Sequence, residues 1–136
     1  MKLNTRRLVE KDYDILKEWW DFWPGWEAPP RDLLPNNGTG GVIVESNGTP
    51  IVAGFLYTTN SKMVLLEWVI SNPNYRESDR KDAIYILITE CERIIKELGY
   101  KYGVTITKNQ HLINKHKYLG WKQDEKPSYE LVKVLK

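Results

Sequence analysis

The segment from Leu65 to Leu98 reads LLEWVISNPNYRESDRKDAIYILITECERIIKEL. It opens as an apolar strand, turns at a polar stretch that contains Pro73, and continues as a long amphipathic helix. The first N–H groups of a helix have no intrahelical partners, and the helix dipole adds about half a positive charge at that end. The order of strand, turn and helix therefore predicts an anion site whose natural ligand is a phosphate.

Size and composition indicate one globular domain. The chain has 136 residues and 41% apolar content, which is enough for a single core and too little for two. No apolar run approaches the roughly 20 residues of a membrane span, and the first residues lack the apolar core of a signal peptide. We therefore expect residues 1–136 to form a single soluble, cytoplasmic domain with no membrane partner.

Composition also argues against metal and nucleic acid as ligands. Cys91 is the only cysteine, which excludes an intrachain disulfide and a thiolate cluster, and the two histidines, His111 and His116, make a poor zinc site. The formal net charge is +2, with acids and bases mixed along the chain, so no concentrated basic patch is present. The expected ligands therefore include neither a metal nor a nucleic acid.

The order of strand and helix signals predicts a mixed α/β domain. Asn47-Gly48 between two apolar runs is a strong hairpin signal, and the nearly continuous apolar run 63–70 suits a strand buried on both faces. A proline-rich connector with no regular pattern covers about 24–40. The expected elements are a strand at 2–9, a helix at 11–23, strands at 41–45, 51–57 and 63–70, a helix at 79–98, a strand at 102–107, a helix at 109–118 and two strands within 121–135.

This order of elements resembles that of the GNAT superfamily of acyl-CoA-dependent N-acyltransferases. After the fourth strand the family carries the pattern Val-x-Pro-x-Tyr-Arg-Gly-x-Gly-x-Gly/Ala, whose loop amides hold the coenzyme A pyrophosphate. Pro73, Tyr75 and Arg76 match this pattern. A second family pattern, Asn-x-x-Ala-x-x-x-Tyr-x-x-x-Gly-Phe, is matched by Asn109 and Gly120-Trp121. The resemblance implies acetyl-CoA as co-substrate and a mostly antiparallel central sheet of six to seven strands with flanking helices.

The chain departs from the first pattern at Glu77, Asp79 and Lys81, where the family prefers small residues. A side chain there obstructs the approach of a phosphate, and the Asp79 carboxylate repels it. Nearby cations can compensate by direct contact while Asp79 caps the helix and faces away. The alternative is a solvated helix start with mixed charges. The coenzyme contacts that the resemblance implies are Val69, Ile70, Ser71, Arg76, Ser78, Asp79, Arg80, Lys81 and Asn109.

Acyl transfer to an amine needs a base, a donor for the oxyanion and a proton source for the thiolate. Glu67 is a carboxylate in an otherwise apolar strand, where the resembled family often places its base, and burial would raise its pKa. The alternative is that Glu67 faces solvent or pairs with a lysine or arginine. The resemblance implies a backbone N–H within 69–71 as the oxyanion donor.

His116 stands at the position of a family tyrosine that serves as general acid beside the coenzyme sulfur. An imidazolium with an unperturbed pKa of about 6.5 can donate that proton at low pH, so activity would fall as pH rises. The alternative is a surface histidine between Lys115 and Lys117. Asn109 is expected to cap the last helix or to contact the pantetheine arm, with capping favoured.

The first helix and its connector are dense in aromatic residues, in a region that covers the acceptor site in the resembled family. Aromatic walls favour an apolar or cationic amine through burial and cation–π attraction. Trp20 or Trp26 is the tryptophan expected to have an exposed role. The alternative is that Trp19, Trp20 and Trp23 lock the helix to the sheet. The predicted substrate contacts are Trp20, Trp23, Trp26, Glu27 and Tyr57.

These features predict an N-acetyltransferase that moves an acetyl group from acetyl-CoA to a primary amine of a small molecule or peptide by direct attack. The tryptophan-rich first helix and the segment 67–73 resemble small phage-encoded acetyltransferase-like proteins. The alternative function is a non-catalytic module that binds a protein or peptide through the tryptophan-rich region. A homodimer formed through the last strands or the tryptophan surface is compatible with both.

Overall fold

The computed structural model describes residues 3–135, which form a mixed five-stranded sheet in the order β1-β2-β3-β4-β5. The first four strands pair antiparallel, and β5 pairs parallel with β4. The strands are β1 (Leu3–Arg7), β2 (Gly41–Ser46), β3 (Thr49–Thr58), β4 (Met63–Ser71) and β5 (Tyr102–Val104). The helices are α1 (Asp12–Phe22), α2 (Arg80–Glu97) and α3 (Gln110–Tyr118), with short turns η1 (Arg31–Leu33) and η2 (Pro35–Gly38) before β2.

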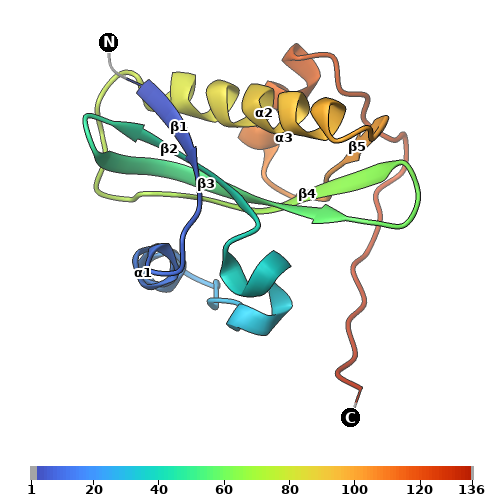
Figure 1. The fold of residues 1–136 in the computed structure, drawn as a ribbon, viewed down its shortest axis with the longest axis horizontal. Helices are drawn as coiled ribbons and strands as arrows, with labels where there is room; N and C mark the ends of the chain where they lie inside the picture. The colour runs from blue at the N-terminus through green and yellow to red at the C-terminus, as the bar shows by residue number, and fades with distance from the viewer. Residues whose placement is uncertain (1–2, 136) are drawn as a thin grey trace.

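The sheet separates two layers (Figure 1). Helices α2 and α3 lie on one side, and α1 lies on the other with the turns η1 and η2. The core between the sheet and α2 includes Val52, Leu66 and Leu87, whereas the core under α1 includes Leu16, Trp20 and Phe55. The alternating side chains of β3 therefore serve two separate cores, as a central strand requires.

The predicted elements through 118 are confirmed to within a few residues, and the fold is α+β with a mixed sheet. Lys2, in the predicted first strand, lies outside the described residues. The two strands expected within 121–135 are wrong, because residues 121–135 are irregular, so the described sheet has five strands and not six to seven. Alternating apolar residues form a strand only where a neighbouring strand takes up their backbone hydrogen bonds, and that neighbour is absent here among residues 3–135.

The hairpin predicted at Asn47-Gly48 is confirmed. Both residues have positive φ, 50° at Asn47 and 83° at Gly48, which is the left-handed pair of a type I′ turn. Asparagine and glycine tolerate this backbone, and the turn's twist matches that of the strands it joins. The local sequence is therefore sufficient to set the pairing of β2 with β3.

A buried carboxylate ties β1 to the start of α1. Asp12 is 1% exposed and accepts hydrogen bonds from both terminal nitrogens of Arg6, at 2.8 and 2.9 Å, and from the N–H of Val9. Burial by itself raises the pKa of Asp12, but the Arg6 hydrogen bonds, the Val9 N–H and the positive charges of Arg6 and Lys11 together outweigh it and hold the pKa below its usual value. Arg6 also contacts Glu45 on β2, so one guanidinium joins two strands and a helix.

Of the two tryptophans predicted as candidates for an exposed role, Trp20 is the wrong one. Its side chain is 0% exposed, stacked on Phe55 with ring centroids 6.3 Å apart and in edge contact with Trp68 at 6.1 Å. Trp19 is also buried, so these two tryptophans lock α1 to the sheet. Trp26, at 50% exposed, matches its prediction. The amphipathic face of an isolated helix did not reveal which tryptophan would meet the bulky residues of β3 and β4.

Replacing Trp20 with alanine is expected to lower the free energy of unfolding by about 3–5 kcal/mol, because it leaves a large cavity between Phe55 and Trp68. The matched control is Trp26→Ala, which removes the same side chain from an exposed position and should change stability by no more than about 0.5 kcal/mol. Urea unfolding of the three proteins measures both values. An equal decrease in the free energy of unfolding for the two variants would contradict this account of the core.

Candidate active site

Strands β4 and β5 separate soon after they meet. They pair only over Met63–Leu65 and Tyr102–Val104. Beyond that point side chains replace the ladder, since the Thr105 hydroxyl donates to the carbonyl of Leu66 at 2.6 Å and the Ile106 N–H donates to Oε2 of Glu67 at 2.7 Å. From Trp68 to Ser71, β4 has β3 on one side and, within residues 3–135, no strand on the other. The backbone groups on that second side have no strand partner there, although the Ser71 carbonyl accepts the indole N–H of Trp23.

A bulge lies in β4 next to this separation. Ala53 opposes Ile70 and Phe55 opposes Glu67, so β4 carries one residue more than β3 over this interval. Trp68 within it has a φ of 58°, a left-handed conformation that a bulky residue rarely adopts. The ring of Trp68 packs against buried Trp20, which holds the bulge in place. Sequence reasoning missed this feature, because tryptophan carries no signal for positive φ.

Glu67 is a half-buried carboxylate at this junction. Burial raises its pKa to about 7; the hydrogen bond from Ile106 lowers the pKa in part, and the charge of Glu130 raises it. Among the ion pairs of the described residues, none includes Glu67. The alternative of a pairing with lysine or arginine is therefore wrong. A carboxylate with a pKa near neutrality can accept a proton from a substrate and release it again.

Three cations surround the start of α2. Arg76 and Lys81 are exposed, Arg80 is half-buried, and none belongs to an ion pair of the described chain. The carboxylates of Glu77, Asp79 and Asp82 lie in the same segment, so the formal charge of residues 76–82 is balanced. Exposed Ser78 adds a hydroxyl to the segment. An anion bound here would depend on direct contacts more than on the overall field.

Asp79 stands at the N-cap position of α2, but the prediction that its side chain caps the helix is wrong. It makes no side-chain cap hydrogen bond, and its Oδ1 accepts the hydroxyl proton of Tyr75 at 2.7 Å. The phenol four residues earlier offers a donor that draws the carboxylate away from the helix N–H groups. The first turn of α2 is therefore left without a side-chain cap, although the N–H of Arg80 donates to the carbonyl of Glu77.

His116 is 3% exposed, so the prediction of a surface histidine is wrong. Its ring meets Trp121 edge to face at 4.7 Å, and Trp121 donates its indole N–H to Glu92 on α2. The alternating lysines around His116 suggested solvent, but the helix turns its imidazole toward α2. Burial lowers the pKa of His116, which makes the ring neutral at pH 7.

The tautomer of His116 also bears on its predicted role as general acid. Nδ1 lies 2.9 Å from the carbonyl oxygen of Leu112, which only accepts hydrogen bonds, so Nδ1 carries the single ring proton. Nε2 is buried without a partner among the described atoms and carries no proton. A bare Nε2 cannot donate to a thiolate, so this arrangement does not fit the predicted acid. Its packing instead joins α3 to α2.

The favoured role of Asn109 is confirmed: its Oδ1 accepts the N–H of Leu112 at 3.1 Å and caps α3. Among the predicted substrate contacts, Trp23 is half-buried and its indole N–H reaches the carbonyl of Ser71 at 3.4 Å. This contact brings the end of α1 to the unpaired part of β4. Tyr57 is half-buried and donates to the carbonyl of Leu33.

Trp26 and Glu27 are exposed in the connector after α1. Their exposure leaves them accessible to a substrate, whereas buried Trp20 has no exposed surface with which to contact one. The structure thus places Trp23 in contact with the bulged strand β4, and it excludes Trp20 from the predicted substrate contacts.

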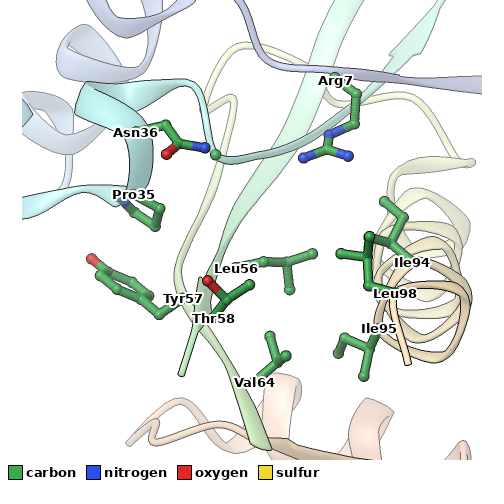
Figure 2. A pocket seen from close by; sticks show the side chains of 11 residues that line it. Arg7, Pro35, Asn36, Leu56, Tyr57, Thr58, Val64, Ile94, Ile95 and Leu98 are labelled. Atoms are coloured by element: carbon green, nitrogen blue, oxygen red, sulfur yellow. The ribbon is translucent and has the colours of Figure 1, made fainter. Parts of the chain in front are cut away.

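A cavity of about 320 Å³ lies elsewhere, between the C-terminal half of α2 and the turn η2 (Figure 2). Pro35 and Asn36 lie on the side opposite Ile94 and Leu98, Leu56 and Val64 lie between them, and the Arg7 guanidinium points toward the cavity from one end. Glu67 does not line it. The candidate site along the unpaired part of β4 is therefore separate from this cavity.

Within residues 3–135, no helix has the length and apolarity needed to cross a membrane. In the same part of the chain, histidine, cysteine, aspartate and glutamate side chains do not gather in a group of three suited to a metal ion.

No known family model matches this sequence, and no curated protein matches it. Solved structures do match. AAC(6')-Iy, in complex with the bisubstrate analog CoA-S-monomethyl-acetylneamine, aligns at 16% identity over 98% of this chain and 100% of its own, with a TM-score of 0.68. The ribosomal-protein-S18-alanine N-acetyltransferase from Escherichia coli aligns at 12% identity over 87% of this chain and 76% of its own, also with a TM-score of 0.68.

N-acetylglutamate synthase from Neisseria gonorrhoeae, complexed with coenzyme A and L-arginine, aligns at 11% identity with a TM-score of 0.72. The alignment covers 93% of this chain and 30% of the synthase, so here the likeness is to one part of a longer protein. Identities this low establish a shared fold and nothing finer. Together with the mixed sheet and its separated strands, they show that this chain has the fold of the GNAT acetyltransferases.

Proposed function

We propose that this protein is an N-acetyltransferase that moves an acetyl group from acetyl-CoA to a primary amine by direct attack. The observation that carries the proposal is Glu67, a half-buried carboxylate with a pKa of about 7 where β4 and β5 separate. A base with this pKa is efficient at neutral pH. The fold supports the same chemistry, since a structural neighbour of this chain was solved with a bisubstrate analog that contains coenzyme A.

The residues at the start of α2 fit a pyrophosphate. Arg76, Arg80 and Lys81 are cations outside the ion pairs of the described chain, and the first helical turn has no side-chain cap. Cationic side chains and backbone N–H groups at a helix start are the two kinds of donor that bind a dianion. The hydrogen bond from Tyr75 fixes Asp79, the one acidic group at the N-cap itself. We assign the contacts of the pantetheine arm and acyl group to the unpaired backbone of Val69, Ile70 and Ser71.

The chemistry then divides among a few groups. Bound acetyl-CoA supplies an acyl group activated as a thioester. Glu67 accepts a proton from the substrate ammonium, the resulting amine bonds to the acyl carbon as the carbon–sulfur bond breaks, and the new amide nitrogen releases its second proton to solvent. Backbone N–H groups within 69–71 stabilise the negative charge on the carbonyl oxygen. Because Nε2 of His116 carries no proton, the departing thiolate takes its proton from solvent.

The acceptor would lie on the α1 side of β4, near Trp23, Trp26, Glu27 and Tyr57. Exposed aromatic faces and a carboxylate suit an organic ammonium group on a small molecule or peptide. A second candidate function is supported by Phe22 and Trp26, which are 54% and 50% exposed. These rings could bind a protein or peptide on a domain that no longer binds coenzyme. A measurement of coenzyme binding distinguishes the two functions, because only the acetyltransferase would bind acetyl-CoA.

Acetyl-CoA is expected to raise the melting temperature by several degrees at saturation, since ligand at about 100 times its Kd contributes about 2.7 kcal/mol. Arg76→Ala should weaken binding about tenfold by removing a charged phosphate contact. The control is Lys96→Ala, which removes an exposed cation at the other end of α2 and should leave the affinity unchanged. Calorimetric titration measures all three proteins. No binding by the natural chain would favour the non-catalytic function.

Glu67→Gln is expected to lower kcat/KM by about 10²–10⁴-fold and to leave the Kd for acetyl-CoA unchanged. In the natural protein kcat/KM should rise with pH and level off above about 7, since the base must be ionised. The assay follows thiol release with a panel of primary amines. Glu18→Gln, a matched change at an exposed position on α1, is the control. An unaltered rate in Glu67→Gln would exclude this carboxylate as the base.

The ionisation of Glu67 is also measurable without a substrate. Its folded-state pKa of about 7 exceeds the usual 4.5, so the folded state binds more protons and stability falls as pH rises between these values. Glu67→Gln removes that loss. The variant should therefore gain stability over the natural protein at about pH 8 and gain little at about pH 5. Urea unfolding at each pH measures the difference, and a gain that is the same at both would contradict the raised pKa.

A further inference from the structure

The cavity beside α2 takes no part in the proposed acetyl transfer, and its lining has a composition of its own (Figure 2). Much of its wall is hydrocarbon, from Leu56, Val64, Ile94, Ile95 and Leu98. Its volume of about 320 Å³ is roughly twice that of an engineered cavity of about 150 Å³ that binds benzene, so it has room for about a dozen non-hydrogen atoms. A space of this size and character suits a small organic molecule.

The cavity follows from the unequal lengths of the strands. Strand β2 begins at Gly41, whereas β3 continues to Thr58 and pairs there with β4 alone among the described strands. The turn η2 and the residues after it take the place of β2, since the N–H of Leu56 donates to the carbonyl of Gly40 at 2.9 Å. The C-terminal half of α2 covers this narrower part of the sheet, so a space remains between the helix and the turn.

The wall formed by η2 is held in a fixed shape. Asn36 and Asn37 both have left-handed backbones, with φ of 50° and 55°, a conformation that asparagine tolerates. The N–H of Gly40 donates to the carbonyl of Pro35 at 2.9 Å and closes the turn. A Cβ at Gly40 would lie 2.6 Å from Cβ of Pro35, so this close approach requires glycine. The wall is therefore formed before a ligand arrives, which lowers the entropic cost of binding.

Arg7 supplies the charge of the cavity. Among the described residues that line the space, no other is charged. Its Nε donates to the carbonyl of Gly41 at 3.3 Å, and within residues 3–135 its two terminal nitrogens make no hydrogen bond and no ion pair. The guanidinium points toward the cavity from one end (Figure 2). Both terminal nitrogens are therefore available to an acceptor on a ligand.

The carboxylate of Glu90 on α2 does not use up this charge. Hydrogen bonds from Arg93 are the main reason that the pKa of Glu90 lies below its usual value, and the charge of Arg7 contributes less. Arg93 donates from Nε and from one terminal nitrogen to the two oxygens of Glu90, at 2.9 and 2.8 Å. Glu90 is thus already paired with Arg93, and Arg7 keeps its positive charge for a ligand.

A cation at one end of a hydrocarbon-lined space fits an apolar molecule with one carboxylate. The two terminal nitrogens of a guanidinium match the two oxygens of a carboxylate in spacing and plane, whereas a phosphate dianion calls for more donors. The Asn36 side chain makes no hydrogen bond within residues 3–135 and lies near the same end as Arg7 (Figure 2). We propose that this cavity binds a small carboxylic acid, with the carboxylate on Arg7 and the apolar tail against Leu56, Ile94 and Leu98. This proposal does not rest on the proposed acetyl transfer.

NMR of the full chain labelled with ¹⁵N tests the site, with 4-phenylbutyrate as the probe because it joins one carboxylate to an apolar tail in about a dozen non-hydrogen atoms. The amide signals of residues 7, 56–58 and 94–98 should shift together and saturate, with a Kd of about 1 mM for a ligand of this size. The control is 4-phenylbutyramide, which has the same shape without the charge and should bind about tenfold more weakly or less. Equal binding of the amide, or shifts confined to other residues, would overturn the proposal.

Two variants test the placement of the probe. Arg7→Met removes the charge but keeps an apolar stem and should weaken binding about tenfold or more. The matched control is Lys108→Met, which makes the same change in net charge at an exposed residue outside the cavity and should leave the affinity unchanged. Thr58→Trp keeps Arg7 but fills the space from an exposed position in its wall, and should abolish binding. Unchanged affinity in either Arg7→Met or Thr58→Trp would contradict the assignment.

A final titration separates this cavity from the candidate active site. Saturating acetyl-CoA should leave the affinity for 4-phenylbutyrate unchanged, because Glu67 and the start of α2 do not line the cavity. Displacement of the probe by acetyl-CoA would place the probe in the coenzyme site, and the proposal would then be wrong. Since no step measures acetyl transfer, a failure of the proposed enzymatic activity would not alter these results.

Discussion

The hydrogen bond from the Ile106 N–H to the Glu67 carboxylate, at 2.7 Å, is the contact on which the rest of this structure depends. It takes the place of a ladder bond where β4 and β5 stop pairing, so the strands separate without leaving that N–H unsatisfied. At this position the Glu67 carboxylate is half-buried, and burial raises its pKa to about 7. One side chain therefore replaces a ladder bond where the strands separate and supplies a titratable group at that point.

The opening is held by packing on the other side of the sheet. Trp68 adopts a left-handed backbone in the β4 bulge, which costs about 1–3 kcal/mol for such a residue and persists only where its surroundings hold it. Trp20 provides that support, since it lies between Phe55 and Trp68 with no exposed surface. The core under α1 therefore supports the bulge of β4 directly. A loss of packing at Trp20 is expected to disturb the strand that carries Glu67.

The molecule is least closed at the C-terminal side of the sheet. Among the described strands only β4 pairs with β5, and the exposed residues 122–135 extend past the α1 side of the sheet (Figure 1). The cavity beside α2 is separate from this region, since Glu67 does not line it.

Some features followed from residues close together in the chain. Asn47-Gly48 makes a hairpin, Asn109 caps α3, and the apolar spacing of 79–98 forms α2, because each depends on local backbone chemistry. Other features required partners far away in the sequence. Burial of Trp20, the bond of Asp79 to Tyr75, the tautomer of His116 and the unpaired state of 121–135 were all missed or wrong. Residue type and periodicity predict what a segment can do, but only the packed structure decides which neighbour satisfies it.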